Sequence, residues 1–144
     1  MTLYLDTSSL VKLYVPEAGS SEVRALFADA DIAATSTIAY PETRAALARL
    51  RREDILPRGQ FTTIKRSFEA EWPEYLVLDV TSGVSREAGE LAEQYGLRGF
   101  DAVHLASFAA IARAAGVGST QFSSFDERLN RAARDLSRRL QRAN

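Results

Sequence analysis

Apolar residues recur along this chain in two alternating patterns: short runs typical of buried strands, and longer stretches with the spacing of one helix face. The short runs predict strands at residues 3–6, 31–38, 75–80 and 120–125. The helical spacing predicts helices at residues 8–15, 22–30, 41–52, 57–72, 84–96, 100–116 and 126–141. Strands that alternate with helices favour a parallel sheet with right-handed crossovers and helices on both faces, which is a three-layer α/β/α sandwich.

The helix expected at residues 100–116 differs from the others because nearly all of its positions are apolar or small. A helix that is apolar on most sides is buried at the centre of its domain. The chain has 144 residues and shows no internal repeat, linker or low-complexity tract. We therefore expect a single domain that spans residues 1–144.

Composition excludes several classes of protein. The chain has no cysteine, which removes disulfides, thiolate catalysis and cysteine-based zinc sites. No apolar stretch approaches the roughly 20 residues that a membrane span needs. The N-terminal segment is interrupted by Asp6 and Lys12 and does not end in a cleavage site. We expect a cytoplasmic protein without a membrane partner.

Four carboxylates stand where a predicted strand ends or the next helix begins: Asp6, Glu42, Asp101 and Asp126. The carboxyl ends of parallel strands face one crevice, so these groups can converge there although they are far apart in sequence. Carboxylates brought that close repel one another, and a hard divalent cation such as Mg²⁺ relieves the repulsion by taking oxygen ligands. None of the four has an evident basic neighbour in the sequence. Metal-assisted hydrolysis of phosphodiester bonds is the leading hypothesis.

Capping is the alternative for each acid taken singly, because Asp is a common helix N-cap and an acidic first turn complements the helix dipole. Ser8 and Ser124 each stand two residues from a key Asp and could hydrogen-bond carboxylates around a metal, or could cap locally. His104 lies three residues after Asp101, and a buried histidine bonded to backbone or to a carboxylate is favoured over a general acid or base.

Charge distribution bears on a nucleic-acid substrate. The formal charge is −1, but without the four site acids 18 basic residues face 15 acidic ones, a balance of +3. Arginine, whose planar fork matches phosphate, is concentrated near the C-terminus. Arg128, Arg131 and Arg134 recur at three-residue spacing and are candidates for RNA contacts, with a solvated helix face as the alternative.

Four segments in this order resemble one known family: LDTSSLVKLYVPE, the segment around Glu42, RGFDAVHLASF and SSFDERL. Together they are similar to PIN-domain ribonucleases, and specifically to VapC-type toxins of bacterial toxin–antitoxin pairs. The resemblance extends from residue 3 to about residue 133. Phe100 departs from it, since smaller residues are common before the third acid, and we expect this ring to reshape the rim of the cleft.

The resemblance implies a PIN-like α/β/α sandwich and an endoribonuclease that depends on Mg²⁺ or Mn²⁺. It also implies a homodimer and inhibition by a small VapB-type antitoxin encoded beside the toxin. Carried over by position, Asp6, Glu42, Asp101 and Asp126 become the acidic metal-binding quartet. Ser8 and Ser124 become the polar neighbours of that site.

Two other functions remain open. A haloacid-dehalogenase-like phosphatase also has an Asp after its first strand, but its D-x-D motif needs a second carboxylate where this chain has Ser8. A PIN-like fold could instead serve as a non-catalytic binding module. That function predicts the loss of one or more of the four acids, and all four are present.

Overall fold

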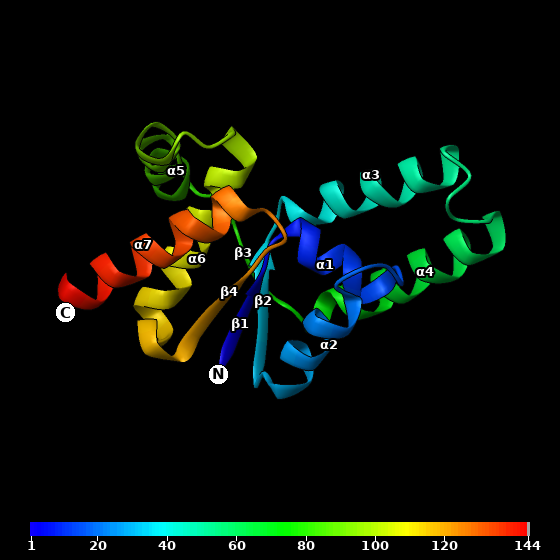
Figure 1. Cartoon of the computed structure of the whole chain (residues 1–144), viewed down its shortest axis with the longest axis horizontal. Coiled ribbons are helices and arrows are strands. Elements are labelled where there is room, and N and C mark those ends of the chain that lie inside the picture. Colours follow the sequence, from blue (N-terminus) through cyan, green and yellow to red (C-terminus); the bar gives the residue numbers. More distant parts are fainter. Residues whose placement is uncertain (144) are drawn as a thin grey trace.

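A four-stranded parallel sheet lies between two layers of helices in the computed structural model, which describes residues 1–143 (Figure 1). The strand order is β3-β2-β1-β4, so β1 is a central strand. The strands are β1 (Thr2–Leu5), β2 (Ile32–Ser36), β3 (Leu76–Leu78) and β4 (Thr120–Ser123). The predicted three-layer α/β/α fold is confirmed.

Side chains of β1 alternate between the two layers. Leu3 and Leu5 pack with residues of α1 (Thr7–Tyr14), α2 (Ser20–Asp29), α3 (Ala39–Arg52) and α4 (Arg58–Glu71). Tyr4 packs on the other side with residues of α5 (Ser82–Tyr95), α6 (Gly99–Ala115) and α7 (Glu127–Ala143). Short 3-10 turns, η1 (Trp72–Glu74) and η2 (Val117–Ser119), precede β3 and β4. Because both faces of β1 are covered, its sequence is a nearly continuous apolar run.

Helix α6 is the buried helix that its composition predicts. Ala102, Leu105, Ala106 and Ala109 have no exposed surface, and α6 contacts α5, α7, β2 and β4. Small residues let these neighbours approach closely. The helix points its first turn, which carries Asp101, toward the carboxyl ends of β1 and β4 (Figure 1).

Element boundaries differ from the predictions by one to a few residues at several ends. Strand β4 ends at Ser123 instead of residue 125, because the Ser124 hydroxyl accepts the Asp126 amide at 3.0 Å and turns the chain. Helix α3 begins at Ala39, so the prediction that Pro41 takes its first position was wrong by two residues. Proline is tolerated there because first-turn amides have no partner within the helix.

The sheet has a switch point between β1 and β4. From β1 the chain builds β2 and β3 on one side, and β4 later pairs with the free side of β1, with Leu5 opposite Ser123. A crevice outside the carboxyl ends of the strands is the usual binding place in such a sheet. The loops after β1 and β4 therefore border the same crevice.

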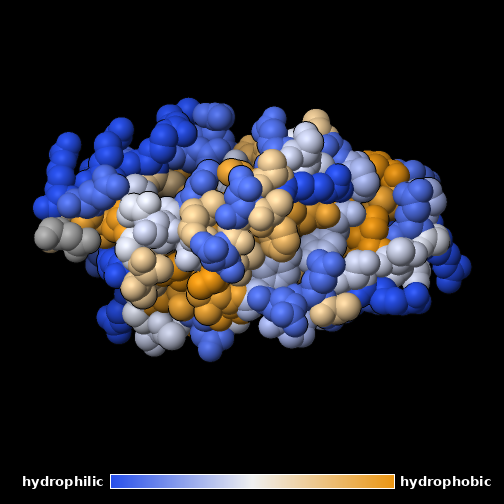
Figure 2. Space-filling view, turned by 90° about the horizontal axis from the view of Figure 1, so that it is seen from below, coloured by the Kyte–Doolittle hydropathy of each residue, from blue (hydrophilic) through white to orange (hydrophobic). Residues whose placement is uncertain are grey.

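The opposite end of the sheet carries exposed apolar side chains. Phe27 on α2 and Ile32 and Leu76 at the start of β2 and β3 are 39, 46 and 48% exposed. Figure 2 looks onto this end and shows hydrophobic side chains between hydrophilic ones. Across residues 1–143, none of the helices combines the length and apolar character needed to cross a bilayer.

The loop after β4 is held by a contact between Phe125 and Gly19. Gly19 has φ +91°, a left-handed conformation that favours glycine, and its Cα faces the Phe125 ring. The Lys12 ammonium lies 4.7 Å from the centroid of the same ring. These contacts fix the segment that carries Asp126.

Replacing Gly19 by alanine should destabilise the protein by about 1–3 kcal/mol, because the new Cβ collides with the Phe125 ring at a positive φ. Gly89→Ala is the matched control: Gly89 lies exposed within α5 with open space around it, so alanine should add about 0.5–1 kcal/mol of stability. Urea unfolding of both variants measures the difference. Changes of the same sign would show that Gly19 has no special role.

Candidate functional site

The four acids lie at the carboxyl end of the sheet. Asp6 follows β1, Asp126 follows β4, and Glu42 and Asp101 stand in the first turns of α3 and α6. Two cavities open beside them. One of about 460 Å³ is lined by Glu42, Arg98, Gly99, Phe100 and Asp101. The other, of about 640 Å³, is lined by Leu97, Arg98, Asp101, Phe125, Asp126, Glu127, Arg128 and Arg131.

Arg98 and Asp101 line both cavities, so three of the predicted acids border one continuous region. Asp6 lines neither cavity. It is buried at the end of β1, 4% exposed. The structure thus brings all four acids to one end of the sheet, with three beside the cavities and Asp6 buried.

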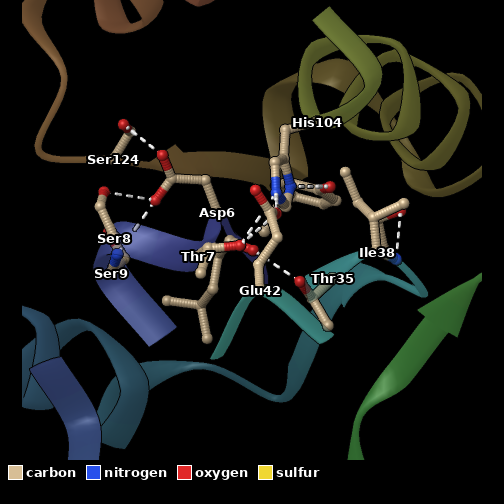
Figure 3. A network of polar contacts seen from close by, with 12 residues as sticks. Asp6, Thr7, Ser8, Ser9, Thr35, Ile38, Glu42, His104 and Ser124 are labelled. Atoms are coloured by element: carbon tan, nitrogen blue, oxygen red, sulfur yellow. Dashed lines mark hydrogen bonds and ion pairs between the residues drawn. The ribbon is translucent and has the colours of Figure 1, made fainter. Parts of the chain in front are cut away.

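Asp6 is held by three donors (Figure 3). Its Oδ1 accepts the Ser8 hydroxyl at 2.7 Å and the Ser9 amide at 3.0 Å, and its Oδ2 accepts the Ser124 hydroxyl at 2.5 Å. Burial raises the pKa of Asp6, and these hydrogen bonds only partly offset that effect. Within residues 1–143 it forms no ion pair. A buried carboxylate without a cationic partner suits a bound cation.

Glu42 has different surroundings. Its Oε1 accepts the Thr7 hydroxyl at 2.6 Å and lies 2.9 Å from Nε2 of His104. Burial alone would raise the pKa of Glu42, but the hydrogen bonds from His104 and Thr7 and the charge of His104 lower it overall. Figure 3 shows Glu42 turned toward these two side chains while Asp6 turns toward its serines.

His104 is the buried histidine that was favoured on the sequence, at 2% exposure. Its Nδ1 lies 2.9 Å from the Tyr4 hydroxyl. Burial raises the pKa of Tyr4 well above its usual value, so this hydroxyl stays protonated beside Nδ1. On the other side of the ring, an ionised Glu42 oxygen can only accept, so Nε2 is the donor in that contact. Thr7 and Tyr4 were not singled out by the sequence, because a hydroxyl after an acid and a tyrosine in a strand are both common.

Asp101 accepts Nε of Arg98 at 3.2 Å, and the Arg98 side chain is 84% exposed. The expectation that the acids lack basic neighbours was therefore wrong for Asp101, and also for Glu42, which has His104. The three-residue spacing of Arg98 and Asp101 was the signal that could have shown the first pair.

Two of the acids cap a helix, which was the alternative role considered for each of them. Asp6 caps α1 through the Ser9 amide, and Oδ1 of Asp126 accepts the Leu129 amide at 2.9 Å at the start of α7. Ser8 and Ser124 both donate to Asp6. This agrees with the prediction that they hydrogen-bond a carboxylate of the site. A cap uses one carboxylate oxygen and leaves the acid able to take a further ligand.

The donors fit a divalent cation in kind, since all four are carboxylates and hard cations take oxygen ligands. In residues 1–143, however, no group of three or more His, Cys, Asp or Glu side chains is gathered closely enough to hold a metal. Glu42 and Asp101 each contact a local basic side chain instead.

The three candidate arginines of α7 do not all line the same cavity. Arg128 and Arg131 line the cavity of about 640 Å³, and Nη1 of Arg128 donates to the Gly96 carbonyl at 3.1 Å. Arg134 lines a different cavity of about 390 Å³, together with Phe122 and Ser137. With 3.6 residues per turn, Arg134 lies about 120° around the helix from Arg128.

The sequence profile of the PIN-domain family matches residues 3–135. Two curated relatives from Mycobacterium tuberculosis, ribonuclease VapC45 of strain CDC 1551 and ribonuclease VapC49 of strain H37Rv, are each 42% identical to this chain over 109 residues. The match covers 76% of this chain and 76% of each relative. The chain belongs to the PIN-domain family.

Solved structures agree with the family. FitAcB from Neisseria gonorrhoeae has a TM-score of 0.67 at 18% identity, with 92% of this chain and 93% of that chain covered. VapC20 from Mycobacterium tuberculosis, described as a sarcin–ricin loop cleaving toxin, has a TM-score of 0.64 at 19% identity, with 90% and 94% covered. The predicted similarity to VapC-type PIN ribonucleases is confirmed, and the phosphatase alternative is not supported.

Asp6→Asn should stabilise the metal-free protein near neutral pH. Because folding raises the pKa of Asp6, the ionised carboxylate disfavours the folded state above that pKa, and protonation removes the penalty. The advantage of the variant should therefore shrink as the pH falls toward the ordinary value of 3.8. Urea unfolding with a chelator, measured across pH, tests this.

Asp135→Asn is the control with the opposite sign. The Tyr95 hydroxyl and neighbouring arginines lower the pKa of Asp135, so its ionised form stabilises the fold above the ordinary pKa. This variant should lose stability near neutral pH and approach the wild type in acid. A destabilised Asp6→Asn protein at pH 7 would contradict the electrostatic account of Asp6.

Proposed function

We propose that this protein is a divalent-metal-dependent endoribonuclease that acts as the toxin of a toxin–antitoxin pair. One observation carries the proposal. In a PIN fold, Glu42, Asp101 and Asp126 border two adjoining cavities at the same end of the sheet as Asp6, a buried carboxylate without an ion pair in residues 1–143. The ribonuclease relatives at 42% identity support the same activity.

Dependence on a divalent metal is typical of PIN-domain ribonucleases. We assign Mg²⁺ or Mn²⁺ to this site, with Asp6, Glu42, Asp101 and Asp126 as the residues that would hold it. When bound, such an ion supplies a Lewis acid that offsets the charge of the scissile phosphate and makes water a better nucleophile. Asp101 would then exchange Arg98 for the cation, while Glu42 would offer the oxygen that His104 and Thr7 leave free.

The remaining polar residues position the acids. Ser8 and Ser124 orient the two oxygens of Asp6, and their hydroxyls keep that carboxylate aimed in one direction. His104 and Thr7 fix Oε1 of Glu42, which leaves its other oxygen available. Tyr4 holds the imidazole in the orientation that this contact needs.

The proposed partners are RNA, a cognate VapB-type antitoxin and a second copy of the chain in a homodimer, all of which would meet the toxin in the cytoplasm. Similarity to a toxin–antitoxin complex from Klebsiella pneumoniae, with a TM-score of 0.57 at 17% identity, supports a fold able to take such a partner. Arginine from an antitoxin could occupy the acidic cavities and compete with RNA. The single domain over residues 1–144 is part of this proposal.

A non-catalytic PIN-like module is the second function considered. It needs no precise arrangement around its acids. Here Asp6 accepts three donors and Glu42 accepts two, which is the ordered environment that catalysis requires.

Asp101→Asn and Asp6→Asn should each reduce RNA cleavage by roughly 100-fold or more, because several kcal/mol of charge stabilisation is lost while side-chain size is kept. The assay incubates purified protein with total cellular RNA and Mg²⁺ or Mn²⁺ and maps new RNA ends. Asp79→Asn is the matched control, because Asp79 is an exposed acid just after β3 that lines neither cavity.

Metal binding can be measured separately from cleavage, through the stability that Mn²⁺ adds to the folded protein. Mn²⁺ at 100 times its Kd should stabilise the wild type by about 2.7 kcal/mol, and Asp79→Asn likewise, but not the Asp6→Asn/Asp101→Asn double variant. Wild-type cleavage by both single variants would exclude this active site. An unchanged shift in the double variant would place the ion elsewhere.

Arg131→Gln should weaken RNA binding and lower the slope of log K against log salt by about 0.7, the contribution of one phosphate contact to a single strand. It should raise KM with little change in kcat. Arg134→Gln is the matched control on the same helix, because Arg134 faces another cavity. Binding measured across a salt series decides the point. Equal slopes for the two variants would show that Arg131 makes no phosphate contact and belongs to a solvated helix face.

A further inference from the structure

Phe100 is an exposed aromatic side chain at the edge of the acidic site. Its exposure is 65%, compared with 39% for Phe27 and 40% for Phe125. It stands in the first turn of α6, directly before Asp101, and lines the cavity of about 460 Å³ with Glu42. It belongs to none of the apolar clusters of the core. The fold therefore does not account for this ring.

The two phenylalanines near the site differ in whether their rings are covered. The Phe125 ring lies against Gly19, and the Lys12 ammonium sits 4.7 Å from its centroid. Phe100 makes no aromatic or cation–π contact with any residue of the described part of the chain. Of these two rings, Phe100 is the one whose faces are uncovered beside the acids.

Arginines stand beside the acids in the cavity next to that of Phe100. The exposed Arg98 guanidinium stands two residues before it and lines both cavities, and Arg128 and Arg131 line the larger one. A ring next to cationic groups is the combination that binds a single strand, since bases stack on aromatic faces while the backbone follows positive charge.

We propose that Phe100 stacks on an unpaired base of the RNA next to the scissile phosphate, so that this ring positions the substrate at the acids. This inference rests on the proposed ribonuclease function. In a continuous A-form duplex every base face is covered by its neighbours, so the ring would have nothing to stack on. The arginines that line the adjoining cavity favour a nucleic-acid strand at this ring over a protein partner.

The test compares two fluorescently labelled probes, a 12-nucleotide RNA of random sequence and an abasic ribose-phosphate chain of the same length. Both are titrated with full-length protein carrying Asp6→Asn, so that cleavage does not disturb the measurement. Phe100→Ala should weaken binding of the base-containing RNA by about 5- to 150-fold, the range for loss of one base–aromatic stack. Binding of the abasic chain should stay the same.

Two further variants separate stacking from general effects. Phe100→Trp keeps a flat ring and should retain affinity within a few-fold, whereas Phe100→Leu keeps apolar volume and should lose it. Phe27→Ala is the matched control, because that exposed ring lies on α2 at the other end of the sheet, and it should bind both probes as the parent protein does.

Equal affinity of Phe100→Ala and the parent protein for base-containing RNA would overturn the inference, even with metal-dependent cleavage intact in the wild type. So would a parent protein that binds both probes equally. If Phe100→Ala left RNA binding unchanged but weakened the complex with a co-encoded antitoxin, the ring would be a protein contact. Base-dependent binding through Phe100, without any cleavage by wild-type protein, would support the stacking site and reject the nuclease proposal.

Discussion

Burial of the Asp6 carboxylate is the constraint on which the rest of the site depends. A charge at 4% exposure must be compensated, and here the compensation comes from hydroxyls and an amide contributed by two distant segments. Ser8 and Ser9 lie in the first turn of α1, and Ser124 follows β4, so the hydrogen bonds of Asp6 join the segments on either side of the switch point. These donors reduce the desolvation penalty without removing it, since the pKa of Asp6 stays raised. The fold therefore maintains a carboxylate whose charge a cation would stabilise.

Glu42 shows the opposite response to partial burial. Its pKa is lowered because His104 and Thr7 donate to it, and Tyr4 in turn orients His104. One acid of the site is thus kept ionised by local donors while its neighbour is charged at a cost. Glu42 is therefore stabilised as a carboxylate by its own hydrogen bonds in the free protein. The charge of Asp6 is the one that a bound cation would stabilise. Because Tyr4 lies in β1 and His104 in α6, the core of the domain sets the position of Glu42.

Alternating apolar patterns predicted the layer order and the parallel sheet, because buried strands and amphipathic helices differ in period. They also placed Asp6, Glu42, Asp101 and Asp126 at one end of the sheet. The patterns could not show that Ser124 bonds to Asp6, since the two residues are 118 positions apart and only the register of β1 with β4 brings them together. Nor could they separate Arg131 from Arg134, because the face that each presents depends on how α7 packs. Arg98 was missed although its spacing from Asp101 is local.

The slightly negative net charge is compatible with an RNA substrate once position is considered. Acids concentrate at the carboxyl ends of the strands, while Arg98, Arg128 and Arg131 line the same cavities. Long-range attraction to phosphate depends on such local arrangement more than on the sum of charges. The acids repel phosphate and the arginines attract it, so an RNA strand without a cation in the site would be held mainly by the arginines. With the proposed function, binding and cleavage would therefore be separable, with the arginines acting on RNA binding and the acids on cleavage.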